Sequence, residues 1–148
     1  MRFNRLAYLG WVLLSMSLFL SCKSKKLPVV TFSDLDGRWN IVELNGKSLN
    51  PNETDQLLEL DMARNILSGK AGCNRMMGRV EYDKTRKHII RFLDISSTRR
   101  ACPNLKLEQE LLEALGNVAR FEVQGESVPI SEVVLYGINN DKLLVLKR

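Results

Sequence analysis

The chain has 148 residues, with 22 basic and 17 acidic side chains, 45% hydrophobic residues, three cysteines and one histidine. This length and apolar content fit a single domain with its own core, and they exclude a disordered or collagen-like chain. The one histidine, His88, excludes a multi-histidine metal site and makes any catalytic triad depend on that residue.

Residues 1–21 are predicted to be a lipoprotein signal peptide. Two arginines precede an uncharged run from Leu6 to Leu20, which is shorter than the roughly 20 apolar residues that a bilayer-spanning helix needs. The run ends at Ser21-Cys22, which resembles the lipobox of bacterial lipoproteins. We therefore expect Cys22 to be the first mature residue and to carry the lipid. An ordinary secretory signal and an uncleaved anchor, both with an incidental Cys22, are the alternatives.

Residues 22–33 are predicted to be a tether between the lipid and the domain. The tether begins with a polar, lysine-rich stretch that is a poor start for a strand or a helix. Anchoring by more than one acyl chain is effectively permanent. Lys23 follows the cysteine at the position where an acidic residue favours retention in the inner membrane of some bacteria. We therefore expect a cell-envelope protein in the outer membrane that faces the periplasm.

From residue 34 onward, short runs of strand-forming residues alternate with turn residues, which is typical of an antiparallel β domain. Asn45-Gly46 is a strong hairpin signal, and the polar residues 83–87 and 139–141 predict two further turns. The predicted strands are, in chain order, Trp39 to Leu44, Leu57 to Met62, Asn65 to Ser68, Arg79 to Tyr82, His88 to Ile95, Arg120 to Val123, Val133 to Ile138 and Leu143 to Leu146.

One segment, Leu105 to Leu115, has the spacing of an amphipathic helix. Asn104 is expected to cap its start and Gly116 to end it. The apolar stripe consists of Leu107, Leu111, Leu112 and Leu115, and the residues expected largely on other faces are Glu108, Glu110 and Glu113. The predicted fold is mainly β within the α+β class: a compact curled antiparallel sheet or small barrel of seven or eight strands, with this helix covering an open side.

The charge of the folded part is balanced once the five basic residues of 1–26 are set aside. Seventeen basic and seventeen acidic side chains remain in 27–148. A neutral domain argues against nucleic acid as a partner. The charge is nevertheless uneven along the chain, because residues 64–100 contain ten basic and three acidic residues.

Two cysteines, Cys73 and Cys102, remain after Cys22 is assigned to lipid. An even number in an exported protein favours a disulfide, because the periplasm oxidises thiols. Two buried free thiols, or a metal-binding or catalytic thiol, are the alternatives. Together with His88 the pair does not complete a zinc site, since structural zinc takes four ligands.

Three stretches, Leu35 to Gly46, Ser68 to Arg75 and Ser97 to Cys102, resemble the META (HslJ-like) domain family in order and spacing. The resemblance covers nearly all of residues 34–148. It implies a small β-rich domain of bacterial envelope lipoproteins and secreted proteins, associated with stress, without a cofactor and without an established enzymatic activity.

The segment from Ala71 to Gly78 is predicted to be a tight bend with a structural role. Gly69, Gly72 and Gly78 permit positive φ or close approach of the backbone, and Asn74 tolerates left-handed geometry. A phosphate-binding loop is the alternative, but the segment lacks the Gly-Lys-Ser/Thr ending of such loops.

Arg75, Arg99 and Arg100 are the candidate anion-binding residues, with Arg79 as a further member. Two guanidinium groups close to a disulfide can be pre-organised to bind a carboxylate or a phosphate. The alternative is that these arginines neutralise Asp94 or the glutamates of the helix.

No catalytic or metal-binding arrangement emerges from the sequence. Ser96 and Ser97 lack a base at a recognisable spacing, and His88 is expected at the surface. We therefore expect a non-enzymatic envelope protein without a cofactor. Its expected partners are the membrane, through acylated Cys22, and either an envelope protein or a small anionic ligand.

Overall fold

A computed structural model describes residues 30–103, 105–125 and 129–148. The strands are β1 (Gly37–Leu44), β2 (Lys47–Ser48), β3 (Gln56–Asp61), β4 (Ile66–Ala71), β5 (Arg75–Tyr82), β6 (Ile90–Ser97), β7 (Val118–Gln124), β8 (Glu132–Gly137) and β9 (Lys142–Lys147). The helices are the 3₁₀ helix η2 (Phe32–Leu35), the short α2 (Pro51–Thr54) and α3 (Leu105–Gly116).

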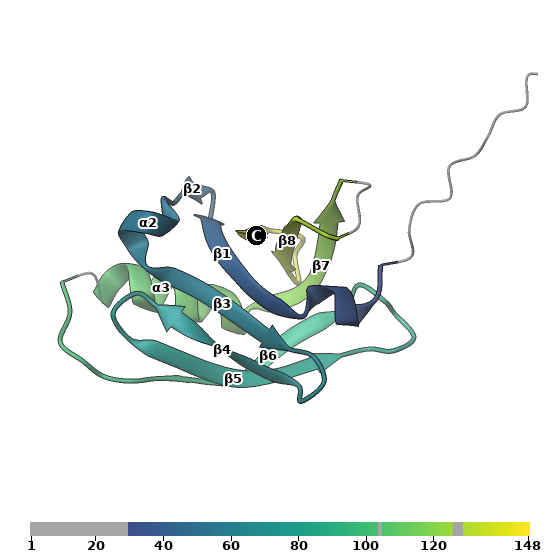
Figure 1. Cartoon of the computed structure of the whole chain (residues 1–148), viewed down its shortest axis with the longest axis horizontal. Helices are drawn as coiled ribbons and strands as arrows, with labels where there is room; N and C mark the ends of the chain where they lie inside the picture. Colours follow the sequence, from purple (N-terminus) through teal and green to yellow (C-terminus); the bar gives the residue numbers. More distant parts are fainter. Residues whose placement is uncertain (1–29, 104, 126–128) are drawn as a thin grey trace, which may run out of the picture.

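The strands form one antiparallel sheet in the order β6-β5-β4-β3-β1-β9-β8-β7, with β2 paired to β1 (Figure 1). The sheet curls until its two outer strands approach each other at one point. There Ile89 bridges to Arg120, and the backbone N–H of Phe121 donates to the carbonyl oxygen of His88 at 2.9 Å. The predicted mainly β fold with a curled antiparallel sheet is confirmed.

All eight predicted strands are present, and the ninth, β2, follows the predicted Asn45-Gly46 turn. Both turn residues have positive φ, 48° and 79°, as a two-residue hairpin turn requires. The strand after this turn is only two residues long, because Asn50 then starts α2 by accepting a hydrogen bond from the backbone N–H of Asn52 at 3.2 Å. Neither α2 nor η2 was predicted from the sequence.

The core lies inside the curl of the sheet, where α3 also packs. Trp39 is fully buried, and its indole N–H donates to the carbonyl oxygen of Leu35 at 2.8 Å. Leu111 and Leu115 of α3 belong to the same hydrophobic core. The predicted helix is therefore confirmed, and it contacts β6, β1, β4 and β9. Its predicted cap, Asn104, lies outside the described residues.

The antiparallel strands give the domain two ends, which lie on opposite sides of Figure 1. We call one the disulfide end: it contains α2, the β4–β5 turn and the start of α3. We call the other the tether end: it contains η2, the β3–β4 turn and the β5–β6 turn. At the tether end the ring of Phe32 packs on Tyr82 with centroids 4.3 Å apart, so the N-terminal helix is fixed beside the end of β5.

The predicted signal peptide and most of the predicted tether, with Cys22, lie outside the described residues. Among the helices of the described part of the chain, none has the length and apolar character to cross a bilayer.

Candidate functional site

The predicted bend over Ala71 to Gly78 is shorter than expected, because Arg75 to Gly78 belong to β5 and only residues 72–74 form the β4–β5 turn. The glycines nevertheless permit positive φ or close approach of the backbone, as predicted. Gly72 has a φ of +132°, and the backbone N–H of Ala71 donates across the turn to the carbonyl oxygen of Asn74 at 2.9 Å. Gly69 has a φ of +152°, and a Cβ there would lie 2.0 Å from the carbonyl oxygen of Leu57. A residue with a side chain is therefore excluded at position 69 without a shift of the β3 backbone.

Asn74 is the centre of a buried polar network. Its side chain is 1% exposed, and it does not adopt the left-handed geometry that the sequence suggested. Its Nδ2 group donates to Glu108 Oε2 at 3.1 Å and to the carbonyl oxygen of Arg100 at 3.3 Å. Its Oδ1 atom accepts from Thr98 Oγ1 and from the backbone N–H of Arg100, both at 2.8 Å. Asn74 thus joins the turn, the segment after β6 and α3.

Glu108 is the residue of this network that the sequence interpretation placed wrongly. Expected on a face away from the leucines, its side chain is instead buried, with 6% exposed. Its spacing of three and seven residues from Leu111 and Leu115 places it on the same face of α3. This spacing from Leu111 and Leu115 is the sequence signal that could have predicted a buried Glu108 in contact with a polar residue such as Asn74.

Cys73 and Cys102 lie at disulfide distance beside Asn74, with Cα atoms 6.3 Å apart and a separation of 29 positions in sequence. The pair connects the same two segments that the Asn74 side chain connects. The bend and the segment after β6 are therefore joined by a buried hydrogen-bond network, with two cysteines beside it at disulfide distance.

This network fixes the backbone of Arg75. The backbone N–H of Arg75 donates to Thr98 Oγ1 at 3.1 Å, and the carbonyl oxygen of Arg75 accepts from the backbone N–H of Thr98 at 3.0 Å. The Arg75 side chain is exposed on the outer face of the sheet. A guanidinium group is thus presented from a rigidly held backbone.

Arg75 lines a shallow groove of about 670 Å³ that crosses the outer face of the sheet; we call it the sheet-face groove. One row of paired residues crosses it from β1 to β6: Arg38, Glu59, Ser68, Met77 and Ser96. Met77, which is 59% exposed, gives this row an apolar centre between hydroxyl groups.

Most cations near this groove have an acidic partner. Arg38 lies 3.5 Å from Glu59, and Lys70 lies 2.9 Å from Asp55. Among the described residues, Arg75 is the cation of the groove for which no ion pair is present.

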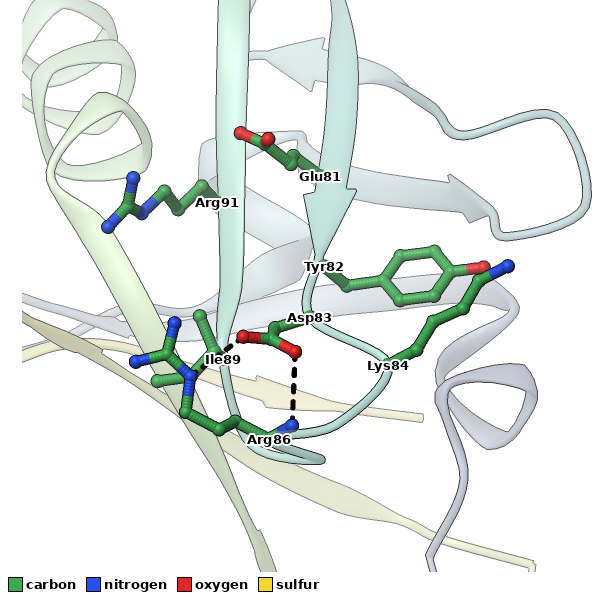
Figure 2. A pocket seen from close by; sticks show the side chains of 7 residues that line it. All are labelled: Glu81, Tyr82, Asp83, Lys84, Arg86, Ile89 and Arg91. Carbon is green, nitrogen blue, oxygen red and sulfur yellow. Dashed lines mark hydrogen bonds and ion pairs between the residues drawn. The ribbon is translucent and has the colours of Figure 1, made fainter.

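A second depression, of about 370 Å³, lies at the β5–β6 turn on the tether end (Figure 2). Asp83 organises the turn: its Oδ1 atom accepts from the backbone N–H groups of Thr85 at 2.9 Å and Arg86 at 3.1 Å, and its Oδ2 atom accepts from Arg86 Nε at 2.7 Å. The Thr85 hydroxyl, followed by the Arg86 guanidinium and the two backbone N–H groups, holds the pKa of Asp83 well below its ordinary value.

The described residues contain no group of three or more histidine, cysteine or carboxylate side chains arranged to hold a metal ion. Their buried carboxylate, Glu108, is hydrogen-bonded to Asn74. Asn74, Thr98 and Glu108 are thus engaged with one another, while Cys73, Cys102 and Glu108 also line a small depression of about 200 Å³ beside α2.

Comparison with known proteins agrees with this geometry. The META domain family model matches residues 31–148. The chain belongs to the META domain family. No curated protein matches it.

Two solved structures share the fold of this META domain. An NMR structure of a protein from Burkholderia xenovorans has a TM-score of 0.57 and 24% identity, and the match covers 86% of this chain and 95% of that chain. A crystal structure of a DUF4847 family protein from Bacteroides vulgatus has a TM-score of 0.53 and 16% identity, and the match covers 76% of this chain and 92% of that one. At this level of identity the likeness concerns the fold alone.

One of the four candidate arginines of this META domain is engaged by an acidic side chain. Arg79 forms an ion pair with Asp94 at 2.8 Å, which agrees with the alternative that the arginines neutralise nearby acids. Arg99 and Arg100 are exposed but do not line the sheet-face groove, and the backbone of Arg100 serves the Asn74 network. Anion binding by Arg75, Arg99 and Arg100 stays a prediction, and Arg75 is the one that the groove includes.

Proposed function

We propose that this protein is a lipid-anchored, non-enzymatic interaction module of the bacterial cell envelope. The observation that carries the proposal is the position of Cys22, directly behind an uncharged run and eight residues before the first described residue, Val30. Such a cysteine is the lipid-bearing residue of bacterial lipoproteins. A role in envelope stress, in the outer membrane facing the periplasm, is part of the same proposal.

The arrangement of the motif side chains supports a role without catalysis. Asn74, Thr98 and Glu108 are hydrogen-bonded to one another or to neighbouring backbone, and the two domain cysteines lie beside them. A general base or nucleophile needs a free face toward a substrate. The sheet-face groove beside these side chains lies open to a partner.

Metabolic labelling with palmitate in a bacterial host tests the anchor. We expect the wild-type chain to be labelled and to partition with membranes, and Cys22→Ser to lose both properties. The matched control is Cys73→Ser with Cys102→Ser, which removes two other thiols and should keep the label. A wild-type chain that is unlabelled and freely soluble after export would contradict the proposal.

The alternative function is binding of a small anionic ligand, and the unpaired Arg75 in the sheet-face groove is the observation that favours it. Its test is a thermal-shift screen with phosphate, carboxylates and acidic peptides. A ligand of this groove should raise the melting temperature of the wild type and of Arg99→Ala, but not of Arg75→Ala. Equal shifts in all three proteins would place the binding elsewhere.

A further inference from the structure

The β5–β6 turn carries a concentration of basic side chains that the family motifs do not include. Lys84, Arg86 and Lys87 lie within four consecutive residues and are all exposed, and His88 follows. We call residues 83–88 the hairpin tip. In Figure 2 Lys84 and Arg86 extend to opposite sides of the turn, so the positive charge is spread across its width.

The acidic side chains around the hairpin tip leave this charge only partly neutralised. Asp83 pairs with Arg86 at 2.7 Å. Glu81 lies opposite Arg91 in the β5–β6 ladder, and Asp61 of the neighbouring turn pairs with Arg64 at 3.6 Å. In the salt bridges of the described residues, Lys84 and Lys87 have no partner.

The chain enters the domain at this same end. Val30 is followed by η2, whose Phe32 packs on Tyr82, and Tyr82 directly precedes the hairpin tip. The described chain therefore begins beside the basic turn, on the tether end of the domain (Figure 1).

The distance from the proposed anchor favours this end as the one that faces the membrane. Val30 is eight positions after Cys22, and an extended chain spans at most about 3.6 Å per position, so the link reaches about 29 Å at most. An eight-residue strand such as β1 is itself about 26 Å long. Bringing the disulfide end to the membrane would require the link to run almost fully extended along the domain.

We propose that the hairpin tip docks on anionic phospholipid headgroups of the membrane to which Cys22 attaches the protein. This inference rests on the proposed lipid anchor. The anchor holds the domain at the surface, and the basic turn sets which end faces it. Each basic residue close to an anionic surface strengthens the contact by roughly fivefold, and salt weakens it. Lys23, Lys25 and Lys26 of the link add charge of the same sign.

The docking can be tested by the reactivity of individual lysines. The lipidated protein is purified in detergent, the acyl mass on Cys22 is verified, and the protein is inserted into vesicles of phosphatidylcholine alone or mixed with phosphatidylglycerol. An amine-reactive reagent is then applied, and modification of each lysine is followed by mass spectrometry. Lys47, which is 67% exposed and lies in a hairpin at the disulfide end, is the internal control.

We expect Lys84 and Lys87 to react roughly fivefold more slowly in the mixed vesicles than in the neutral ones, with the difference lost at high salt. Lys47 should react at the same rate in both. The variant Lys87→Glu should release Lys84 from protection, whereas Lys47→Glu should leave the protection of Lys84 unchanged.

Equal reactivity of Lys84 in the two kinds of vesicle, or equal protection of Lys84 and Lys47, would overturn the docking inference while leaving the anchor intact. Absence of the acyl mass on Cys22 is a different result. It contradicts the proposed anchor and is detected before the reactivity of any lysine is measured.

Discussion

The two ends of the domain use their polar residues in opposite ways. At the disulfide end, Asn74 and Glu108 are buried, and every polar atom of the Asn74 side chain is hydrogen-bonded to a residue distant in sequence. At the tether end, the side-chain hydrogen bonds of the hairpin tip run between Asp83 and residues two or three positions later, although the backbone of His88 also bonds to Phe121. The polar side chains of one end make long-range contacts, and those of the hairpin tip make local ones.

This difference separates the buried motif side chains from the surface that we propose to dock on lipid. The second and third motif stretches meet at the disulfide end, where Asn74, Thr98 and the two cysteines join the β4–β5 turn to the segment after β6 and to α3, whereas the first stretch begins at Leu35 on the tether end. The charged turn lies outside the motifs. A motif in this domain therefore marks a structural requirement, and the exposed charge away from it is where a partner or a surface can act.

The largest effect should follow from opening the Cys73–Cys102 link. Because a cross-link over about 30 residues restricts the unfolded chain, replacing both cysteines with serine should lower the free energy of unfolding by about 3–4 kcal/mol. Chemical denaturation of the wild type with and without reductant, compared with the double variant, measures it. If reductant and the double variant both leave the denaturation midpoint unchanged, the disulfide end is not covalently held.

A slightly smaller loss is expected for Asn74→Ala. This change leaves the buried Glu108 carboxylate and the backbone of Arg100 without their partner, which should cost about 2–3 kcal/mol. The matched comparison is Glu108→Gln, which keeps the shape of the side chain and an oxygen that can accept from Asn74, and should cost less. A double-mutant cycle between positions 74 and 108 should give a clear coupling energy. If the two losses of unfolding free energy simply add, the two side chains do not interact and the proposed network is wrong.

Much of the fold could be predicted because its signals are local. Alternating apolar residues located the strands, and the Asn45-Gly46 and 83–87 turns located two hairpins. The even number of remaining cysteines pointed to Cys73 and Cys102, which the structure places at disulfide distance.

The candidate site was harder to predict because its contacts are distant in sequence. Asn74 and Glu108 are 34 residues apart, and the local sequence around either residue does not predict contact with the other. The position of Arg79 depends on an irregularity in the β5–β6 ladder, where Asp94 has a φ of 54° and its carboxylate meets the Arg79 guanidinium. Residue propensity and spacing do not reveal such a register shift. The sequence alone therefore could not show that Arg79 forms an ion pair and that Arg75 lines the groove without one.

Charge removal at the hairpin tip should have almost no effect on folding. Lys84→Gln with Lys87→Gln removes exposed side chains that take no part in the described hydrogen bonds or salt bridges, so the free energy of unfolding should change by less than about 0.5 kcal/mol. Denaturation curves measure this directly. A large loss of stability would mean that the tether end, like the disulfide end, depends on its polar side chains, and the contrast between the two ends would fail.

The smallest expected effect concerns the protonation of Asp83. Its pKa is held below the ordinary value by the Thr85 hydroxyl and then by Arg86, so the carboxylate stays charged when other aspartates begin to protonate. A group with a lowered pKa in the folded state contributes its stabilisation above the unfolded pKa, near 4, and loses it as the pH falls further toward the folded value. The amide resonances of Thr85 and Arg86 should therefore be constant from neutral pH to about pH 4 and change only below it. In Asp83→Asn the same resonances should be shifted at neutral pH and insensitive to acid. An Asp83 carboxyl carbon that titrates near pH 4 would show that these local hydrogen bonds do not order the turn.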